Sequence, residues 1–353
     1  MQSTGLALQQ DVPLAPLTTL GVGGCAQFLV RAEQVREVEA AVRFAESRQL
    51  PLLVLGGGSN LVVADRGWPG LVLQVALEGI CHYHGQGSEV FEVGAGMNWD
   101  CFVAESVSLD CGGIECLSGI PGSVGGTPVQ NVGAYGQEIS QTVASVLAFD
   151  RRDNCVKPLK AAECGFAYRQ SIFNSSQMGR YIILRVTYEL FPAARPDLRY
   201  VDLERYFAGG ERRPTLLDVR MAIREIRAAK GMLITAGDPD SRSAGSFFKN
   251  PILAEAQYVE LERRAAESNL QVPNYPALAR QKKVSAAWLV ENSGFTKGYR
   301  RGRASISTKH ALAIVNRGGA TAAEILALRD EIQLRVNEIW GIRLEPEPVF
   351  VGF

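Results

Sequence analysis

The chain lacks the features that mark secreted, membrane-spanning and nucleic-acid-binding proteins. None of its apolar stretches approaches the ~20 residues that a membrane-spanning helix needs. Residues 1–10 also lack the basic region and apolar run of a signal peptide. Lysine plus arginine and aspartate plus glutamate number 37 each, so the net charge is zero and gives no general attraction to nucleic acid or anionic membranes. We therefore expect a cytoplasmic protein without nucleic-acid or membrane partners.

Metal-binding and common nucleotide-binding fingerprints are missing as well. The seven cysteines are odd in number, lie in the first half of the chain and form no C-x-x-C pair, which favours reduced thiols. His82 and His84 flank Tyr83, and His310 stands alone, with no further ligand at metal-binding spacing, so no metal site is expected. Neither the G-x-x-x-x-G-K-[ST] motif of P-loops nor the G-x-G-x-x-G motif of Rossmann folds occurs.

The sequence does contain the composition and periodicity of a folded protein with helices and strands. Hydrophobic residues make up 46% of the chain and charged residues 21%, which is enough for a buried core. Helical spacing of apolar residues predicts helices at 34–47, 99–107, 217–229, 253–268, 285–291 and 322–339. Branched and aromatic runs predict strands at 52–55, 71–75, 89–93, 144–149 and 181–190, and an extended tail at 348–353. Beyond Pro192 the pattern is mainly helical.

Two glycine-rich segments carry most of the information about function. The first, residues 55–61, reads Leu-Gly-Gly-Gly-Ser-Asn-Leu and directly follows a predicted strand. Glycines allow positive φ and expose main-chain N–H groups that bind phosphate, although a tight turn would use the same residues. The second, residues 119–136, carries six glycines interleaved with Ser, Thr, Gln and Asn, more than a structural loop requires. A backbone laid along a diphosphate explains this segment better.

Together the two segments resemble the FAD-binding domain of the vanillyl-alcohol-oxidase-type flavoproteins, and they are most similar to the UDP-N-acetylenolpyruvoylglucosamine reductases. The segment 18–24 (Thr-Thr-Leu-Gly-Val-Gly-Gly) is similar to the opening motif of that family. The resemblance implies an α+β fold with a two-part FAD-binding α/β region, 1–70 and 71–230, and a third α/β domain for the substrate, 231–341. The tail, 342–353, is expected to pack back on the first part. The resemblance assigns contacts with non-covalent FAD to Leu55, Gly56, Gly57, Gly58, Ser59, Asn60, Leu61, Ile120, Pro121, Gly122, Ser123, Gly125, Gly126, Thr127, Gln130, Asn131, Gly133, Ala134 and Tyr135.

The reaction that the resemblance implies is the reduction of UDP-N-acetylglucosamine enolpyruvate with NADPH as hydride donor, in peptidoglycan precursor synthesis. Hydride addition builds negative charge next to a carboxylate, so catalysis needs a cation or hydrogen-bond donor there and a source of a proton. The segment 168–173 (Tyr-Arg-Gln-Ser-Ile-Phe) is similar to a family motif in which Arg169 polarises the carboxylate. The alternative for Arg169 is an ordinary surface salt bridge.

Two further segments are similar to catalytic motifs of the family. The segment 244–251 (Ala-Gly-Ser-Phe-Phe-Lys-Asn-Pro) makes Ser246 the general acid, and the alternative is a serine that caps a helix or closes a turn. The segment 344–349 (Leu-Glu-Pro-Glu-Pro-Val) makes Glu347 the residue that orients and stabilises the intermediate. Glu345 is its rival, because an extended segment points both carboxylates to the same face. The register of the motif favours Glu347.

The expected substrate contacts are Tyr168, Tyr200, Lys230 and Asn250. Tyr200 lies in a segment similar to the Tyr-bearing loop of the first subtype of the family, in which it would close over the UDP diphosphate. The alternatives are a packing cluster of Tyr200 with Tyr206 and Phe207 and, for Lys230, a favourable interaction with a helix C-terminus. The basic run 299–303 is expected to be a solvated or substrate-facing loop.

Two other functions fit parts of this pattern. One is a sugar or alcohol oxidase of the same flavoprotein fold, although the glycine segments contain no histidine for covalent flavin attachment. The other is a non-catalytic nucleotide-sugar-binding protein, against which the presence of Arg169, Ser246 and Glu347 argues. The expected partner is a small UDP-sugar substrate, and the chain is expected to act as a monomer.

Overall fold

The computed structural model describes residues 6–210, 212–276 and 281–353. Chain contacts group these residues into two compact units. Unit 1 comprises residues 6–12, Cys25–Gly58 and the described part of Trp68–Ala229. Unit 2 comprises Pro13–Gly24, Ser59–Gly67 and the described part of Lys230–Phe353.

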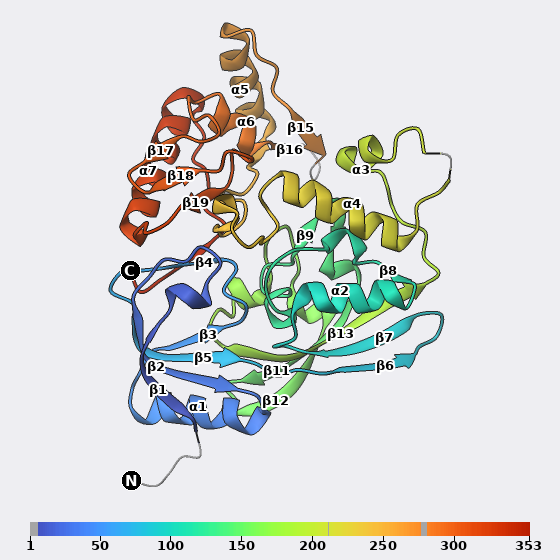
Figure 1. The fold of residues 1–353 in the computed structure, drawn as a ribbon, viewed down its shortest axis with the longest axis vertical. Helices are drawn as coiled ribbons and strands as arrows, with labels where there is room; N and C mark the ends of the chain where they lie inside the picture. Colours follow the sequence, from blue (N-terminus) through green and yellow to red (C-terminus); the bar gives the residue numbers. More distant parts are fainter. Residues whose placement is uncertain (1–5, 211, 277–280) are drawn as a thin grey trace. The chain divides into compact units, whose positions relative to one another are not determined.

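The first sheet of unit 1 has the strand order β1-β2-β5-β3. Its strands are β1 (Leu8–Pro13), β2 (Cys25–Ala32), β5 (Trp68–Val75) and β3 (Leu52–Leu55). Strands β2 and β3 both run parallel to β5. The helix α1 (Val35–Ser47) lies along this sheet (Figure 1) and buries Val38, Ala41 and Val42 against it. Its amphipathic spacing therefore builds one β-α-β layer that ends, after β3, in the first glycine segment.

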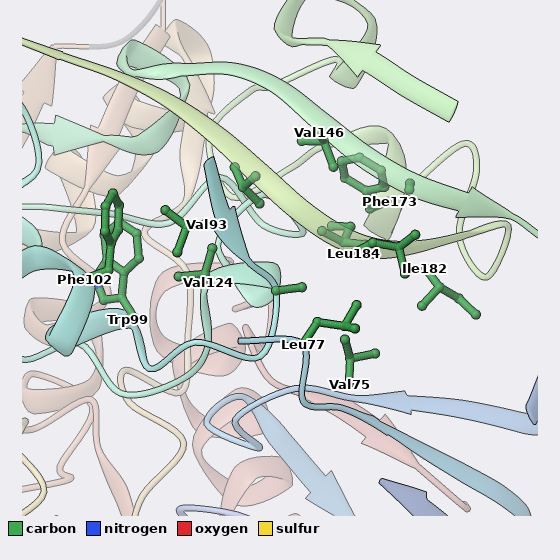
Figure 2. Packing of buried hydrophobic residues seen from close by; sticks show 14 of the residues in the cluster. Val75, Leu77, Val93, Trp99, Phe102, Val124, Val146, Phe173, Ile182 and Leu184 are labelled. Carbon is green, nitrogen blue, oxygen red and sulfur yellow. The ribbon is translucent and has the colours of Figure 1, made fainter. Parts of the chain in front are cut away.

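The second sheet of unit 1 is antiparallel and has the order β12-β11-β13-β7-β6. Its strands are β12 (Cys155–Lys160), β11 (Val143–Asp150), β13 (Tyr181–Pro192), β7 (Glu89–Gly94) and β6 (Ile80–His84), and β8 (Cys111–Gly112) pairs with β13. The helix α2 (Trp99–Ser108) packs Trp99 and Phe102 into the core beside Val93 (Figure 2). The second glycine segment enters this core through Val124, which is fully buried.

Two helices complete unit 1 after β13. Leu203 of α3 (Val201–Tyr206) packs with Val219 and Ile223 of α4 (Leu216–Ala229). A small hairpin, β9 (Gly133–Ala134) and β10 (Gln137–Glu138), lies within the second glycine segment and just after it.

Unit 2 combines short strands with three helices. Its sheets are β14 (Ile252–Ala254), β16 (Gln281–Val284) and β15 (Asn274–Pro276); β17 (Arg300–Arg301), β18 (Ala304–Ile306) and β19 (Ile314–Asn316); and the parallel pair β4 (Leu61–Val63) and β20 (Val349–Val351). Its helices are α5 (Glu255–Glu267), α6 (Ala286–Glu291) and α7 (Ala322–Trp340). Leu328 and Val336 of α7 are fully buried in the core of this unit. None of the helices in the described ranges is long and apolar enough to cross a membrane.

The structure has a mixed α/β architecture and differs from the predicted elements at a few places. The helix predicted at 253–268 begins only at Glu255, because Leu253 and Ala254 belong to β14 and pair with β16. The segment predicted as a loop around Tyr200 continues as α3 from Val201. The strands of unit 2 were hidden by the helical pattern beyond Pro192, since runs of two to four residues are too short to show alternation.

The two units also divide the chain differently from the expected domains 1–70, 71–230 and 231–341. Residue 70 falls inside β5, so we propose that any division between the two sheets of unit 1 follows Val75. Residues 13–24 and 59–67 group with unit 2 for a local reason. The N–H of Gly24 donates to Ala64, and the Asp65 carboxylate accepts N–H groups at the first turn of α7. The tail strand β20 pairs with β4 in this same part of the chain.

Candidate functional site

The two glycine segments meet within unit 1. A Cβ atom added to Gly57 would lie 2.5 Å from Cα of Gly122, and one added to Gly56 would lie 2.7 Å from Oγ of Ser123. Real Cβ atoms do not approach main chain so closely, so glycine at position 57 is required by contact with the second segment. The end of the first segment, from Ser59 to Leu61, belongs to unit 2.

The second glycine segment is fixed to the start of α2. The N–H of Trp99 donates to the carbonyl of Gly122, and the N–H of Val124 donates to Met97. The N–H of Gly119 donates to the Asp100 carboxylate at 2.6 Å. Asp100 also accepts from Arg220, at 2.6 and 3.0 Å, and from Arg224 of α4. Partial burial works against the charge of Asp100, but the Arg220 and Gly119 donors outweigh it and hold the pKa of this carboxyl below its usual value.

This part of unit 1 suits a phosphate-bearing cofactor. Ser123 is 7% exposed, and its Oγ is buried with no hydrogen-bond partner among the described residues. A buried hydroxyl without a partner is costly, and a phosphate oxygen would satisfy it. Gly122, Gly125 and Gly126 lie close to Ser123 in the sequence, and their lack of side chains leaves room for a ligand to approach the main chain. The remaining predicted FAD contacts in unit 1 that lie in these segments are Leu55, Gly58, Ile120, Pro121, Gly125, Gly126, Gln130 and Ala134.

Two predicted FAD contacts have side chains that serve the fold. Oγ1 of Thr127 lies 2.7 Å from the Tyr188 hydroxyl in the core. The amide of Asn131 donates to Glu138 and to the carbonyl of Ala167, and its oxygen accepts the N–H of Ser140. Asn131 also has φ of +45°, which asparagine tolerates better than most residues. We therefore propose that Thr127 and Asn131 shape the loop with their side chains and contact FAD through their main chain.

Arg169 occupies a strained turn of unit 1. Reciprocal main-chain hydrogen bonds between Ala167 and Gln170 close a two-residue turn formed by Tyr168 and Arg169. Arg169 has φ of +55°, a left-handed conformation that costs a non-glycine residue roughly 1–2 kcal/mol. Its Nη2 donates to the carbonyl of Gly133 at 2.8 Å, and its guanidinium lies 5.2 Å from the Tyr168 ring centre. The contact with Gly133 joins Arg169 to the end of the second glycine segment, and strain of this kind gathers at functional residues.

Tyr200 contacts the same end of the second glycine segment. It stands at the N-cap of α3, is 44% exposed, and packs edge-on against Tyr135 with ring centres 5.3 Å apart. Burial raises the pKa of Tyr135, whose hydroxyl is hydrogen-bonded to Arg227 of α4. Tyr206 and Phe207, the expected alternative partners of Tyr200, pack against each other with ring centres 5.0 Å apart, whereas Tyr200 packs on Tyr135.

Ser246 lies in a bend of unit 2, residues 245–247, between two isolated β-bridges at Ser243 and Phe248. The N–H of Phe247 donates to Leu312, and Phe247 and Phe248 are buried. Oγ of Ser246 is 3.5 Å from Nε2 of His310, which is long for a hydrogen bond. Catalytic contacts of this kind often shorten only when the ligand is bound. Among the hydrogen bonds of the described residues, Ser246 neither caps a helix nor closes a turn. Its neighbour His310 was not indicated by the sequence, in which His310 stands alone.

Glu347 is aligned beside this stretch by main-chain pairing. The N–H of Glu347 donates to Phe247, and the N–H of Lys249 donates to Glu345. The Asn60 amide donates to the carbonyl of Glu347 at 3.2 Å, which ties the last part of the first glycine segment to this tail. The rival, Glu345, has a side chain that is 75% exposed and pairs with Nζ of Lys249 at 3.3 Å. The structure therefore brings Ser246, Glu347 and Asn60 into one neighbourhood of unit 2.

The other two predicted substrate contacts, Lys230 and Asn250, belong to unit 2. Lys230 is the first residue of the unit after α4. Oδ1 of Asn250 accepts the N–H of Ala286 at 2.9 Å and so helps to position α6. No group of three or more His, Cys, Asp or Glu side chains in the described ranges is arranged to hold a metal ion.

Comparison with known proteins identifies both halves of the chain. The model of an FAD binding domain matches residues 26–156. The model of the C-terminal domain of UDP-N-acetylenolpyruvoylglucosamine reductase matches residues 238–351. With the paired glycine segments, the first match defines the class: this is a mixed α/β oxidoreductase that binds FAD.

Full-length relatives identify the family. A UDP-N-acetylenolpyruvoylglucosamine reductase of Thermobifida fusca is 48% identical over 351 residues, which cover 97% of this chain and 98% of that protein. One of Streptomyces avermitilis is 46% identical over 349 residues, covering 97% and 94%. The crystal structure of the reductase from Thermus caldophilus aligns over 98% of this chain and 99% of its own, with a TM-score of 0.67 and 28% identity. The chain belongs to the UDP-N-acetylenolpyruvoylglucosamine reductase family, which acts in peptidoglycan precursor synthesis.

Proposed function

We propose that this chain reduces UDP-N-acetylglucosamine enolpyruvate to UDP-N-acetylmuramate, with NADPH as the hydride donor. The observation that carries the proposal is the main-chain pairing of residues 247–249 with residues 345–347 of the tail, which aligns the segments that carry Ser246 and the Glu347 carboxylate. The identity of the relatives over almost the whole chain supports the same reaction. NADPH and the UDP-sugar follow from the resemblance to the family. From the sequence we also propose that the protein is located in the cytoplasm and acts as a monomer.

In this proposal the chain contributes binding, orientation and proton transfer. FAD, when bound, supplies the hydride chemistry. The strained turn presents Arg169 to the substrate carboxylate, where a permanently charged guanidinium stabilises negative charge that develops during reduction. Ser246 donates a proton to the carbon that bears the carboxylate, and His310 stabilises the alkoxide that remains. Glu347 orients the enol-like intermediate.

Four further residues are proposed to bind and select the substrate. We propose that Tyr200 closes over the UDP diphosphate, as in the first subtype of the family, because it is exposed and already contacts Tyr135. Tyr168, Lys230 and Asn250 complete the proposed contacts, the last through its side-chain nitrogen, since its oxygen holds α6. Tyr200→Phe should weaken binding of the UDP-sugar and leave flavin reduction by NADPH unchanged. An unchanged substrate affinity would contradict the proposal that Tyr200 closes over the UDP diphosphate.

An anaerobic reaction tests the proposed function directly. The FAD-loaded protein is first reduced with NADPH and then mixed with UDP-N-acetylglucosamine enolpyruvate, and the flavin absorbance is followed. Reoxidation by the enolpyruvyl substrate is the expected result. Reoxidation by oxygen alone would favour an oxidase, and a preparation that cannot be reconstituted with flavin would exclude both enzymes.

A further inference from the structure

The hairpin of β17 and β18 in unit 2 places its arginines on opposite faces. Arg300 pairs with Ser305, and Arg301 pairs with Ala304. Directly paired residues of an antiparallel ladder share a face, and successive residues alternate. Ala304 packs into the core of unit 2, and Arg301 forms an ion pair with Glu331 of α7. The face that carries Arg300 and Ser305 is therefore separate from the face that packs on α7.

The face with Arg300 lines a pocket of about 400 Å³ that lies wholly within unit 2. Its cationic lining consists of Arg300, Arg303 and Arg317. Arg317 is held by the buried Asp240 at 3.1 Å, and Nη1 of Arg303 donates to the carbonyl of Gly319 at 3.2 Å. Arg300 is exposed and has no ion-pair partner among the described residues. The pocket thus has more guanidinium groups than carboxylates to neutralise them.

A second observation indicates a ligand. Ser305 lines this pocket and is 1% exposed, and its Oγ has no hydrogen-bond partner among the described residues. Buried hydroxyls are normally hydrogen-bonded, because an unmade bond costs about 1–3 kcal/mol. An oxyanion between Arg300 and Arg303 would accept from the guanidinium groups and from Ser305 together, as guanidinium forks favour phosphate oxygens.

We propose that this pocket binds a phosphate monoester group. It is built from the β17–β18 hairpin, Pro239 and the two residues that follow β19, and it shares no residue with the Ser246 and Glu347 segments, so it does not rest on the proposed reductase activity. A volume of about 400 Å³ falls within the range of about 300–1,000 Å³ that is typical of small-ligand sites, so the phosphate belongs to a larger molecule. That phosphate is carried either by the 2′ position of the nicotinamide cofactor or by a separate phosphorylated metabolite.

The test is a calorimetric titration of the FAD-loaded full-length protein with inorganic phosphate, at constant ionic strength to screen unspecific attraction. The double variant Arg300→Gln, Arg303→Gln should lose about tenfold or more in phosphate affinity, the effect of removing charged hydrogen bonds. The matched control is Arg301→Gln, which removes an equal charge from the opposite face and should stay within about twofold of the parent. Ser305→Ala keeps every arginine and should weaken binding by a smaller factor.

The outcomes separate the proposal from its alternatives. Equal affinity in the double variant and in the Arg301→Gln control, or no saturable phosphate binding by the parent, would overturn it. A rise of KM for NADPH with KM for NADH unchanged in the double variant would show that the phosphate is that of the cofactor. An unchanged KM for NADPH, with phosphate binding lost, would show that it belongs to another ligand. Failure of the parent to turn over would contradict the reductase activity and leave the phosphate titration unaffected.

Discussion

The glycine segments of unit 1 and the Ser246 segment of unit 2 are built in opposite ways. In unit 1 the functional feature that we propose is the shape of the main chain: Gly57 lies against Gly122, and a half-buried carboxylate, Asp100, holds the loop in place. In unit 2 main-chain hydrogen bonds align the Ser246 segment with the tail, and the functional groups that we propose are the side chains of Ser246 and Glu347. Substitutions in unit 1 should therefore change folding and FAD binding, whereas those in unit 2 should change the chemical step.

The largest effect is expected for Ser246→Ala. If this hydroxyl is the proton source, the half-reaction with NADPH should remain near normal. The half-reaction with the enolpyruvyl substrate should slow by more than the ~10²–10⁴-fold that is common for a lost general acid. Ser246→Cys should keep much more activity, because a thiol retains a transferable proton. Stopped-flow traces of the two half-reactions give both rates.

Ser243→Ala is the matched control for a structural serine. Its Oγ accepts the N–H of Gly245 at 3.2 Å in the same segment. Loss of such a local bond should lower the free energy of unfolding by about 1 kcal/mol and affect both half-reactions alike. If Ser246→Ala follows this second pattern, the proton comes from another group.

The next largest effect should separate the two tail carboxylates. Glu347→Gln should reduce turnover roughly 10²–10³-fold, as loss of a group that stabilises the intermediate does. Glu345→Gln should alter turnover little, because its exposed pair with Lys249 contributes only about 0–1 kcal/mol. Steady-state kcat of both variants is sufficient. If Glu345→Gln is the slower variant, Glu345 rather than Glu347 is the catalytic carboxylate.

The sequence predicted more of unit 1 than of unit 2, for a physical reason. The glycine-rich composition of the segments that contain Gly57 and Gly122 is visible in the sequence, and α1 follows from the spacing of Val38 and Val42. The arrangement of unit 2 depends on pairings between distant residues, such as β4 with β20, that no local pattern contains. Ser246 was found by its motif, but its neighbour His310 was not, because 64 positions separate them.

In unit 1 the steric argument predicts a stability effect for Gly57→Ala. The added Cβ would meet Gly122 at 2.5 Å, so the two glycine segments must move apart. Overpacking of this kind costs about 1–3 kcal/mol, and the purified protein should contain little FAD. Denaturant unfolding and flavin content measure both effects. Gly126→Ala is the control, because its nearest neighbour would be 4.0 Å away and the fold should be unaffected. Equal destabilisation by both substitutions would contradict the close approach of the segments.

The smallest effect is expected for Asp100, and it tests most specifically the difference between unit 1 and unit 2. Asp100→Asn removes the charge that Arg220 and Arg224 face and should lower the free energy of unfolding by about 1–3 kcal/mol at neutral pH. Because the folded-state pKa of Asp100 is lowered, its contribution is present above the unfolded-state value and is lost as pH falls through the folded-state value. The difference between parent and variant should therefore be constant above about pH 5 and disappear in the acid range below about pH 4, the ordinary aspartate pKa.

Denaturant titrations of the parent and of Asp100→Asn across this pH range give the difference directly. Asp218, whose pKa is also lowered by an arginine, offers the matched control, because its partner Arg212 is exposed and the hydrogen bonds of its carboxylate among the described residues go to Arg212 and Thr215. Asp218→Asn should leave FAD affinity unchanged, whereas Asp100→Asn should weaken it by loosening the N–H anchor of the glycine segment. Turnover of fully FAD-loaded Asp100→Asn should match the parent. A loss of turnover at full flavin loading would mean that the Asp100 carboxylate takes part in the chemistry. In that case unit 1 would contribute a side chain to the chemical step, contrary to the proposed difference between the two units.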